Sequence, residues 1–506
     1  MPKPAVKSLF SFRWGRGRVY LLPLRGLAYG AISLAVVAAL LLFIDRVVLG
    51  TLERGGWTAG EMWRRNNQLV EENHRRKTLG DVDGLRQWRG EPLPAAASTG
   101  ERPTILVLGD SFVFGPPYPT LNQLWWRQLA IELERRGYRQ VQVLAAGRSG
   151  WSTHDQLQRA RTLIPEIKPD LVLWGYVTND PDEKLVPQIA DRNDRGPLPH
   201  RVRMQLQALL PNLMFKFESL RADKLATQYA GPKYGYRYFD WEQKLLEGDN
   251  FARYRETVAA LGKLLGNERT PGVMITLPGW PCREHYEPRY APVLPLWRSA
   301  GVAVCETLEP FLSRYGNAPQ NGPEAIRWGI NPADSHPGPR ATHFHAVMAA
   351  DYLEQHHAEL LGPKDAARPH ELAINDWLPF DLNVRPHGAG EFLLDYPATT
   401  QFMPTLPLDV PTALVALRYP LSVNEIRISG AGLRGVRVWI STLHPAENYD
   451  ECQWRELPRA SGGEFSFRLP ADLAGCALTT VRFSADALGA SRELTLTLVP
   501  AAGEQP

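Results

Sequence analysis

Residues 104–111, TILVLGDS, are the stretch from which the fold can be worked out. The run TILVL has the length and apolar character of a buried strand, and Gly109-Asp110-Ser111 follows it directly. In an open α/β sheet, ligands bind beyond the carboxyl ends of the parallel strands. The stretch therefore predicts a core strand that delivers Ser111 to the functional edge of a sheet.

Similar apolar runs recur along the chain, separated by amphipathic stretches. We expect further strands at 141–145, 171–177, 272–277 and 302–305, and helices at 121–136, 154–167 and 340–361. Alternating strands and helices, with strands that are apolar throughout, predict a parallel sheet covered on both faces. The predicted α/β domain spans 103–365, and residues 181–270 interrupt it as a helical, Arg-rich insertion.

The pattern changes after residue 372, where apolar and polar residues begin to alternate. Such runs, separated by turn residues, occur at 425–428, 436–440, 465–469, 480–483 and 494–498. A period of two is typical of antiparallel strands, so residues 372–506 are predicted to form a β-sandwich. The segments VRVWIS and WREL resemble galactose-binding-like modules, which leaves open a glycan-binding role and a structural or docking role.

The N-terminal region has the pattern of a membrane anchor. Residues 26–44 carry no charge, and at 1.5 Å per residue they span roughly 30 Å, the thickness of a bilayer core. The tail 1–25 contains six basic residues and no acidic one, which predicts a cytoplasmic N-terminus and an extracytoplasmic body. We expect a single transmembrane helix at 26–49, in a bacterium an inner-membrane one with a periplasmic body, followed by a linker at 50–102. A cleaved signal peptide is the alternative.

Composition narrows the class of protein further. The chain has 506 residues, 44% hydrophobic and 22% charged, which is globular rather than disordered or fibrous. Its net charge of +3 comes from the basic tail, so the remainder is weakly acidic and nucleic acid is not an expected partner. The cysteines predict two local disulfides in an oxidising compartment, Cys282 with Cys305 and Cys452 with Cys476. Four free thiols are the alternative, and no metal-type cysteine spacing occurs.

Four blocks of polar residues follow predicted strands or precede the last helix, so they are expected at one edge of the sheet. They are Gly109-Asp110-Ser111, the stretch 146–153 that contains Gly150, Thr178-Asn179-Asp180, and Asp334-Ser335-His336-Pro337. Together they supply what acyl transfer from an ester requires. His336 can take the proton of the Ser111 hydroxyl, and Asp334 can hold the imidazole. The amides of Ser111, Gly150 and Asn179 can stabilise an oxyanion.

With these blocks in this order, residues 103–362 resemble the SGNH (GDSL-type) superfamily of esterases and acyltransferases. The resemblance implies a flavodoxin-like three-layer α/β/α fold. From the residues themselves we expect an acyl-enzyme on Ser111 and no cofactor or metal. The chain departs from the family pattern in two blocks. The last block reads Asp-x-His, whereas Asp-x-x-His is common in the family. The block around Asn179 reads Tyr-Val-Thr-Asn-Asp and lacks the glycine of the frequent Gly-x-Asn-Asp. Gly147 is an alternative oxyanion glycine.

Some polar residues near these blocks allow two interpretations. His343 and His345 could join His336 in a metal site, but residues two apart on a helix point to different faces, so surface or capping histidines are favoured. Asp180 and Asp182 could contact substrate, although acids that form a turn are commoner.

The expected function is that of a membrane-anchored, extracytoplasmic serine O-acyltransferase. It would act on O-acyl groups, foremost acetyl, of a cell-envelope or exported polysaccharide, with a multi-span membrane protein as acyl donor. An SGNH carbohydrate esterase is the first alternative, because hydrolysis shares the acyl-enzyme step. A non-catalytic glycan-binding or scaffold protein is the second.

Overall fold

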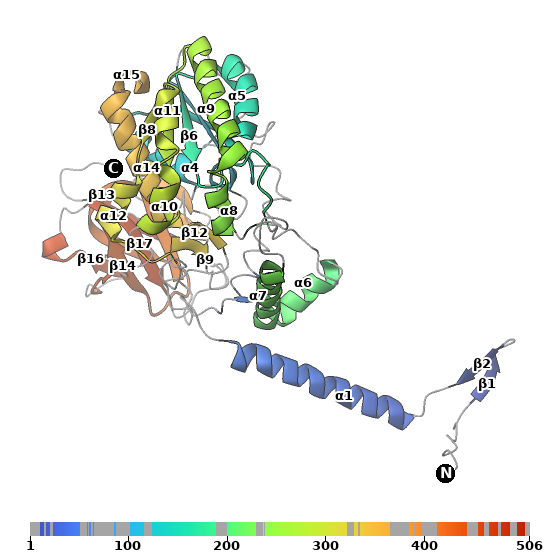
Figure 1. Cartoon of the computed structure of the whole chain (residues 1–506). Coiled ribbons are helices and arrows are strands. Elements are labelled where there is room, and N and C mark those ends of the chain that lie inside the picture. The colour runs from blue at the N-terminus through green and yellow to red at the C-terminus, as the bar shows by residue number, and fades with distance from the viewer. Residues whose placement is uncertain are drawn as a thin grey trace.

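The structure is a computed structural model, and Figure 1 shows its arrangement. It describes residues 11–14, 17–20, 24–50, single residues between 58 and 64, 85–87, 102–115, 124–188, 200–228, 236, 238–320, 328–331, 334–364, 384–388, 391–395, 412–442, 454–459, 465–473, 477–485 and 493–500.

The centre of the body is a six-stranded sheet with the order β3-β5-β4-β6-β7-β8. Strand β3 (Leu85–Gln87) comes from the predicted linker and pairs antiparallel with β5 at the edge. The other five strands are parallel: β4 (Thr104–Gly109), β5 (Gln142–Gly147), β6 (Leu171–Tyr176), β7 (Gly272–Thr276) and β8 (Ala303–Cys305). In chain order this core reads 2-1-3-4-5, the flavodoxin-like arrangement. The predicted α/β fold is confirmed.

The strands are apolar throughout because both faces of the sheet are covered. Leu106 and Leu108 of β4 face α5 (Thr153–Ile167) and α9 (Gly248–Glu268), whereas Ile105 and Val107 face the opposite layer. That layer contains α4 (Trp125–Arg135) and α14 (Pro339–His356), and Trp125 and Trp126 are both buried in it. Helix α9 therefore belongs to the three-layer core, although its sequence lies inside the stretch expected as an insertion.

The rest of that stretch holds three helices outside the two core layers. They are α6 (His200–Leu209), α7 (Pro211–Gln228) and α8 (Tyr238–Lys244). Figure 1 shows α6 and α7 on the side of the body from which the N-terminal helix emerges.

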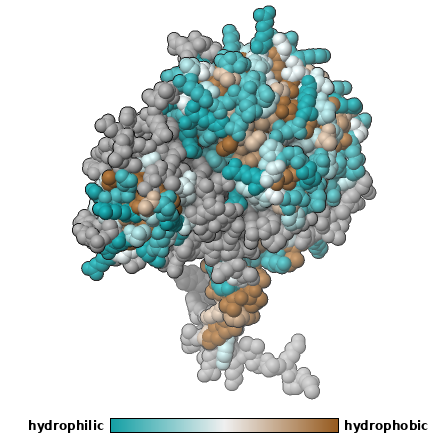
Figure 2. Space-filling model, turned by 90° about the vertical axis from the view of Figure 1, so that its left-hand side faces the viewer, coloured by the Kyte–Doolittle hydropathy of each residue, from teal (hydrophilic) through white to brown (hydrophobic). Residues whose placement is uncertain are grey.

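The N-terminal helix α1 (Leu24–Phe43) continues into a π-helical turn, η1 (Ile44–Val48). The segment Ala28–Val48 is long and apolar enough to cross a membrane, and only 6% of its apolar window is buried in the body. In Figure 2 it is a hydrophobic stalk that projects from the body. A helix of this length and composition can serve as a membrane anchor or as a signal sequence.

The C-terminal region consists of antiparallel strands around a core of its own, as the alternation predicted. The long strand β13 (Thr412–Ser429) pairs with β17 (Ala477–Ser484) through its first part and with β18 (Glu493–Pro500) through its second. Strands β14 (Arg437–Ser441) and β16 (Ser466–Arg468) extend these pairings. Phe467, Phe483 and Leu496 are buried between the strands.

The predicted disulfide between Cys282 and Cys305 is wrong, because the structure has both as free, buried thiols. Cys282 precedes α10 (Arg283–Tyr290) and lies in the core on one face of the sheet. Cys305 ends β8, belongs to the core on the other face, and has its Sγ 3.8 Å from the carbonyl oxygen of Met348. The sheet separates the two side chains. Cys452 and Cys476 lie outside the described residues.

We predict that Cys282 and Cys305 stay unmodified by a thiol reagent in the folded protein. Burial raises the pKa of both thiols, that of Cys305 to about 12, so little reactive thiolate exists at neutral pH. Alkylation of unreduced protein, followed by peptide mass spectrometry, should show both cysteines modified only after denaturation. A disulfide-linked peptide pair containing residues 282 and 305 would contradict this.

Candidate active site

The turn after β4 is close-packed and presents Ser111 at the sheet edge. Asp110 caps the short helix α3 (Ser111–Phe114), because its Oδ1 accepts a hydrogen bond from the Phe112 amide at 2.9 Å. From the neighbouring layer, Trp126 Nε1 donates to the carbonyl oxygen of Val113 at 2.9 Å. Ser111 is half-buried, so its hydroxyl is held by a fixed backbone yet is not sealed in the core.

Two glycines make this packing possible. A Cβ on Gly109 would lie 2.4 Å from Val113 Cγ2, and one on Gly147 would lie 2.8 Å from Val113 Cβ and 2.9 Å from the Asp110 carbonyl oxygen. Gly147 is therefore explained by close approach beneath the turn. Gly150 differs, because it is exposed, has φ +75° and would place a Cβ in open space. The assignment of Gly150 as an oxyanion donor stays a prediction.

Asp110 brings the first and third sequence blocks together. Its Oδ2 accepts from Ser111 Oγ at 3.2 Å and from Asn179 Nδ2 at 3.4 Å. Asn179 follows β6, the strand next to β4, and is half-buried like the serine. The predicted nucleophile and the predicted side-chain oxyanion donor thus contact the same carboxylate oxygen.

The fourth block reaches the same place from the far end of the domain. Strand β10 (Asp334–Pro337) pairs with β9 (Gly329–Asn331), and the His336 ring lies 5.5 Å from the Phe112 ring, centroid to centroid. His336 also lowers the pKa of Asp110 through its charge, so it lies within electrostatic reach of that carboxyl. The side chain of Asp334 lies outside the described residues, and its role as orienter stays a prediction.

Asp180 has a structural role rather than contact with substrate. It is buried and accepts hydrogen bonds from Gln156 Nε2 and from the Val177 amide, both at 2.8 Å. Its own carbonyl oxygen accepts from the Thr153 amide at 2.9 Å. These bonds tie the loop of Asn179 to the start of α5.

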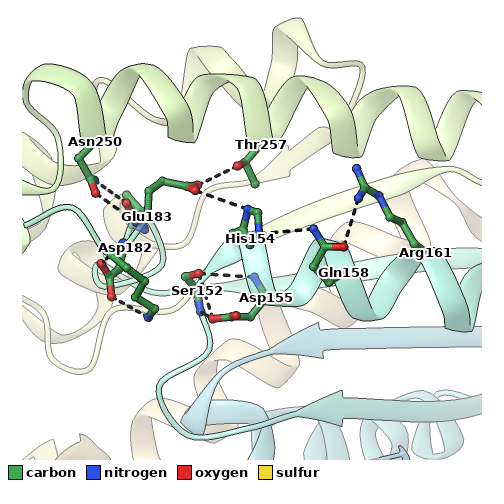
Figure 3. A network of polar contacts seen from close by, with 11 residues as sticks. Ser152, His154, Asp155, Gln158, Arg161, Asp182, Glu183, Asn250 and Thr257 are labelled. Atoms are coloured by element: carbon green, nitrogen blue, oxygen red, sulfur yellow. Dashed lines mark hydrogen bonds and ion pairs between the residues drawn. The ribbon is translucent and has the colours of Figure 1, made fainter.

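The same loop is fixed further along by α9 and α5. Figure 3 shows Glu183 between these helices, where Thr257 Oγ1 donates to Glu183 Oε1 at 2.8 Å and His154 Nδ1 lies 3.5 Å from Oε2. Asn250 Oδ1 accepts from the Glu183 amide at 3.1 Å. Asp182 does not take part in these contacts but forms an ion pair with Lys184, with 2.7 Å between Asp182 Oδ2 and Lys184 Nζ.

Asp110 and Asp180 are both buried carboxyls, and burial raises the pKa of each. The rise is larger for Asp180, since the Asp110 charge adds to burial there. For Asp110 the rise is opposed by the Phe112 amide, by His336 and by the hydrogen bonds of Ser111 and Asn179. The pair therefore favours ionisation at Asp110 before Asp180.

A third buried acid, Glu242, joins the insertion to this site, and sequence analysis missed it. Thr178, the neighbour of Asn179, donates through Oγ1 to Glu242 Oε1. Glu242 Oε2 lies 3.2 Å from Arg289 Nε and 3.4 Å from His285 Nε2. Burial raises the pKa of Glu242 to about 7. The only signal in the sequence is an acid within the aromatic stretch YFDWEQK of α8.

The expectation of surface or capping roles for His343 and His345 is wrong. Both are buried in α14, and burial lowers the pKa of each to about 3. His345 Nε2 lies 3.0 Å from the carbonyl oxygen of Pro278, which can only accept. Within the described part of the chain, no group of three or more His, Cys, Asp or Glu side chains is placed to hold a metal ion.

Comparison with known proteins finds similarity at the level of structure. No protein-family model and no curated protein sequence matches the chain. Similar solved structures include a lipase/acylhydrolase from Enterococcus faecalis (14% identity, 52% of this chain, 99% of that chain, TM-score 0.30). A second is a GDSL-like lipase from Bacteroides thetaiotaomicron (12% identity, 58% of this chain, 98% of that chain, TM-score 0.28). A third is the acetyl xylan esterase AlAXEase (11% identity, 49% of this chain, 99% of that chain, TM-score 0.30).

We predict that Glu242→Gln removes a pH-dependent loss of stability. A carboxyl whose pKa is about 7 in the folded protein, against 4.5 ordinarily, binds more protons folded than unfolded between these values. Stability is therefore lost as pH rises from about 4.5 to 7, by at most about 3 kcal/mol. Glutamine cannot ionise, so its stability relative to wild type should increase over that range in thermal unfolding.

Glu256→Gln is the matched control for this prediction, because Glu256 is exposed on α9. Comparing each variant with wild type at the same pH also cancels the contributions of ionisable groups that do not contact the substituted residue. A difference between Glu242→Gln and wild type that stays constant from pH 5 to 8 would contradict the prediction.

Proposed function

We propose that the chain is a serine-dependent enzyme of the SGNH type that forms an acyl-enzyme on Ser111 from an ester substrate. The observation that carries this proposal is the convergence at Asp110. Ser111 Oγ and Asn179 Nδ2 both contact its Oδ2, and the His336 ring packs beside Phe112, the residue after the serine.

In the proposed reaction, Ser111 Oγ turns from Asp110 towards His336 and gives its proton to the imidazole as it bonds to the ester carbonyl carbon. The tetrahedral intermediate collapses when the bond to the alcohol oxygen breaks, and His336 returns the proton to the departing alcohol. Asp334 would hold the imidazole. A second acceptor, activated by His336, then releases the acyl group and restores the serine.

Asp110 suits this reaction because it orients the Asn179 side-chain amide and leaves one of its N–H groups available. The amide has two N–H groups, and one of them donates a hydrogen bond to the Asp110 carboxylate. The second can point at the oxyanion together with the backbone N–H groups of Ser111 and Gly150. A buried carboxylate that fixes this amide in advance lowers the reorganisation needed in the transition state.

The identity of the acceptor separates two activities. Water gives a carbohydrate esterase, and a sugar hydroxyl gives an O-acyltransferase. We propose O-acyl transfer, most simply of acetyl, to a cell-envelope or exported polysaccharide, with an acyl donor that is itself a multi-span membrane protein. The apolar helix α1 supports a membrane-held enzyme, with its N-terminus cytoplasmic and its body outside the cytoplasm.

We predict that Ser111→Ala lowers p-nitrophenyl acetate hydrolysis by about 10⁴-fold or more, since nucleophile and base act as a unit. Asn179→Ala should lower kcat by about 10²–10³-fold through loss of an oxyanion donor. The matched control is Ser299→Ala, because Ser299 is exposed at the end of α11 (Leu294–Ser299). Equal nitrophenol release by wild type and Ser111→Ala would favour a non-catalytic scaffold or glycan-binding protein.

A separate experiment tests transfer. With an acetyl ester as donor and a panel of neutral and acidic oligosaccharides, mass spectrometry should detect acetylated sugar only with active Ser111. Free acetate without acetylated sugar, across the whole panel, would assign hydrolysis instead.

A further inference from the structure

Helices α6 and α7 expose apolar side chains to an extent seen nowhere else on the described body. Outside α1 and η1, six large hydrophobic residues are exposed in the part of the chain that the structure describes. Four of them lie on these two helices: Val202 (38% exposed), Leu209 (60%), Phe217 (49%) and Leu220 (56%).

The exposed residues of each helix share one face. On α7 they are Lys216, Phe217, Leu220 and Lys224, which at 3.6 residues per turn fall within an arc of about 100°. On α6 they are Arg201, Val202, Gln205, Ala208 and Leu209, within about 120°. Leu210 and Met214, near the junction of the helices, are buried. The described exposed residues thus combine apolar and basic side chains, as in a helix that lies in a membrane interface, and Glu218 of α7 is half-buried and pairs with Arg221 at 3.4 Å.

A buried contact fixes these helices to the end of α1. Asp45 of η1 is completely buried, and its Oδ1 accepts from the Leu213 amide in the first turn of α7 at 2.8 Å. Asn212 Nδ2 donates to the carbonyl oxygen of Asp45 at 3.0 Å. A carboxylate at a helix N-terminus is favourable, and replacing this one would leave buried donors unpaired. Nearby, Gly60 packs against the backbone of Pro211 and Asn212.

We infer that α6 and α7 lie on the surface of the membrane that α1 spans. Phe217, Leu220, Leu209 and Val202 enter the interface, and Lys216, Lys224 and Arg201 meet the phosphates of anionic phospholipid. The inference rests on the proposed anchor, because the end of a spanning α1 would lie at the bilayer surface and Asp45 holds α7 at that level. Anionic lipid is favoured over an apolar protein surface as the partner of this face, because its phosphates attract the basic side chains.

Photo-crosslinking of the full chain tests this inference. Nanodiscs of phosphatidylethanolamine and phosphatidylglycerol would hold variants with p-benzoylphenylalanine at position 217, 220 or, as control, 256 on α9. Residues 217, 220 and 256 are all exposed, and 217 is already aromatic, so the substitutions displace no buried side chain. We expect peptides with the mass of a phospholipid adduct at 217 and 220 and none above background at 256.

The outcomes separate this inference from the proposals on which it rests. Chain that stays in the nanodisc through alkaline carbonate but gives no lipid adduct at 217 or 220 overturns the membrane-surface role alone. Extraction by carbonate overturns the anchor and with it the inference. Crosslinking in native membranes to a protein instead of lipid assigns the face to a protein partner and also overturns it. Nitrophenyl acetate hydrolysis in the same discs reports on Ser111 chemistry independently.

Discussion

Val113 packs against the bare Cα positions of Gly109 and Gly147, and the geometry of the site depends on this contact. It allows the chain to turn from β4 into α3 within one residue, so that Asp110 is buried while Ser111 remains half-exposed. The buried Asp110 carboxylate then needs hydrogen-bond donors. It accepts hydrogen bonds from the Phe112 amide, the Ser111 hydroxyl and the Asn179 side-chain amide, and this brings together Ser111 and Asn179, which the proposed chemistry requires.

The insertion connects the apolar N-terminal helix with this site through two buried acids. Asp45, at the end of the helix, accepts a hydrogen bond from the Leu213 amide in the first turn of α7. Glu242 of α8 accepts a hydrogen bond from the hydroxyl of Thr178, the neighbour of Asn179. The first contact would set how the body sits on a membrane, and the second helps to hold the loop that carries Asn179. Through Thr178, the insertion is therefore hydrogen-bonded to the residue next to Asn179.

Most of the fold could be predicted because the core strands are apolar on both faces, so runs such as 104–108 and 171–177 stand out from their surroundings. The site blocks could be found because each follows a strand or precedes the last helix. Sequence spacing does not tell on which face of a sheet a side chain lies, and the Cys282–Cys305 prediction failed for that reason. Glu242 was missed, and His343 and His345 were wrongly expected at the surface, because one polar residue on a helix does not reveal that it points inward.

Covalent labelling with a fluorophosphonate tests whether Ser111 is a catalytic nucleophile, because phosphonylation requires an activated serine. We predict one adduct, on the peptide that contains Ser111, and its loss in His336→Ala. If the folded wild-type protein gave no adduct, or gave one only on another serine, the proposed role of Ser111 would be contradicted.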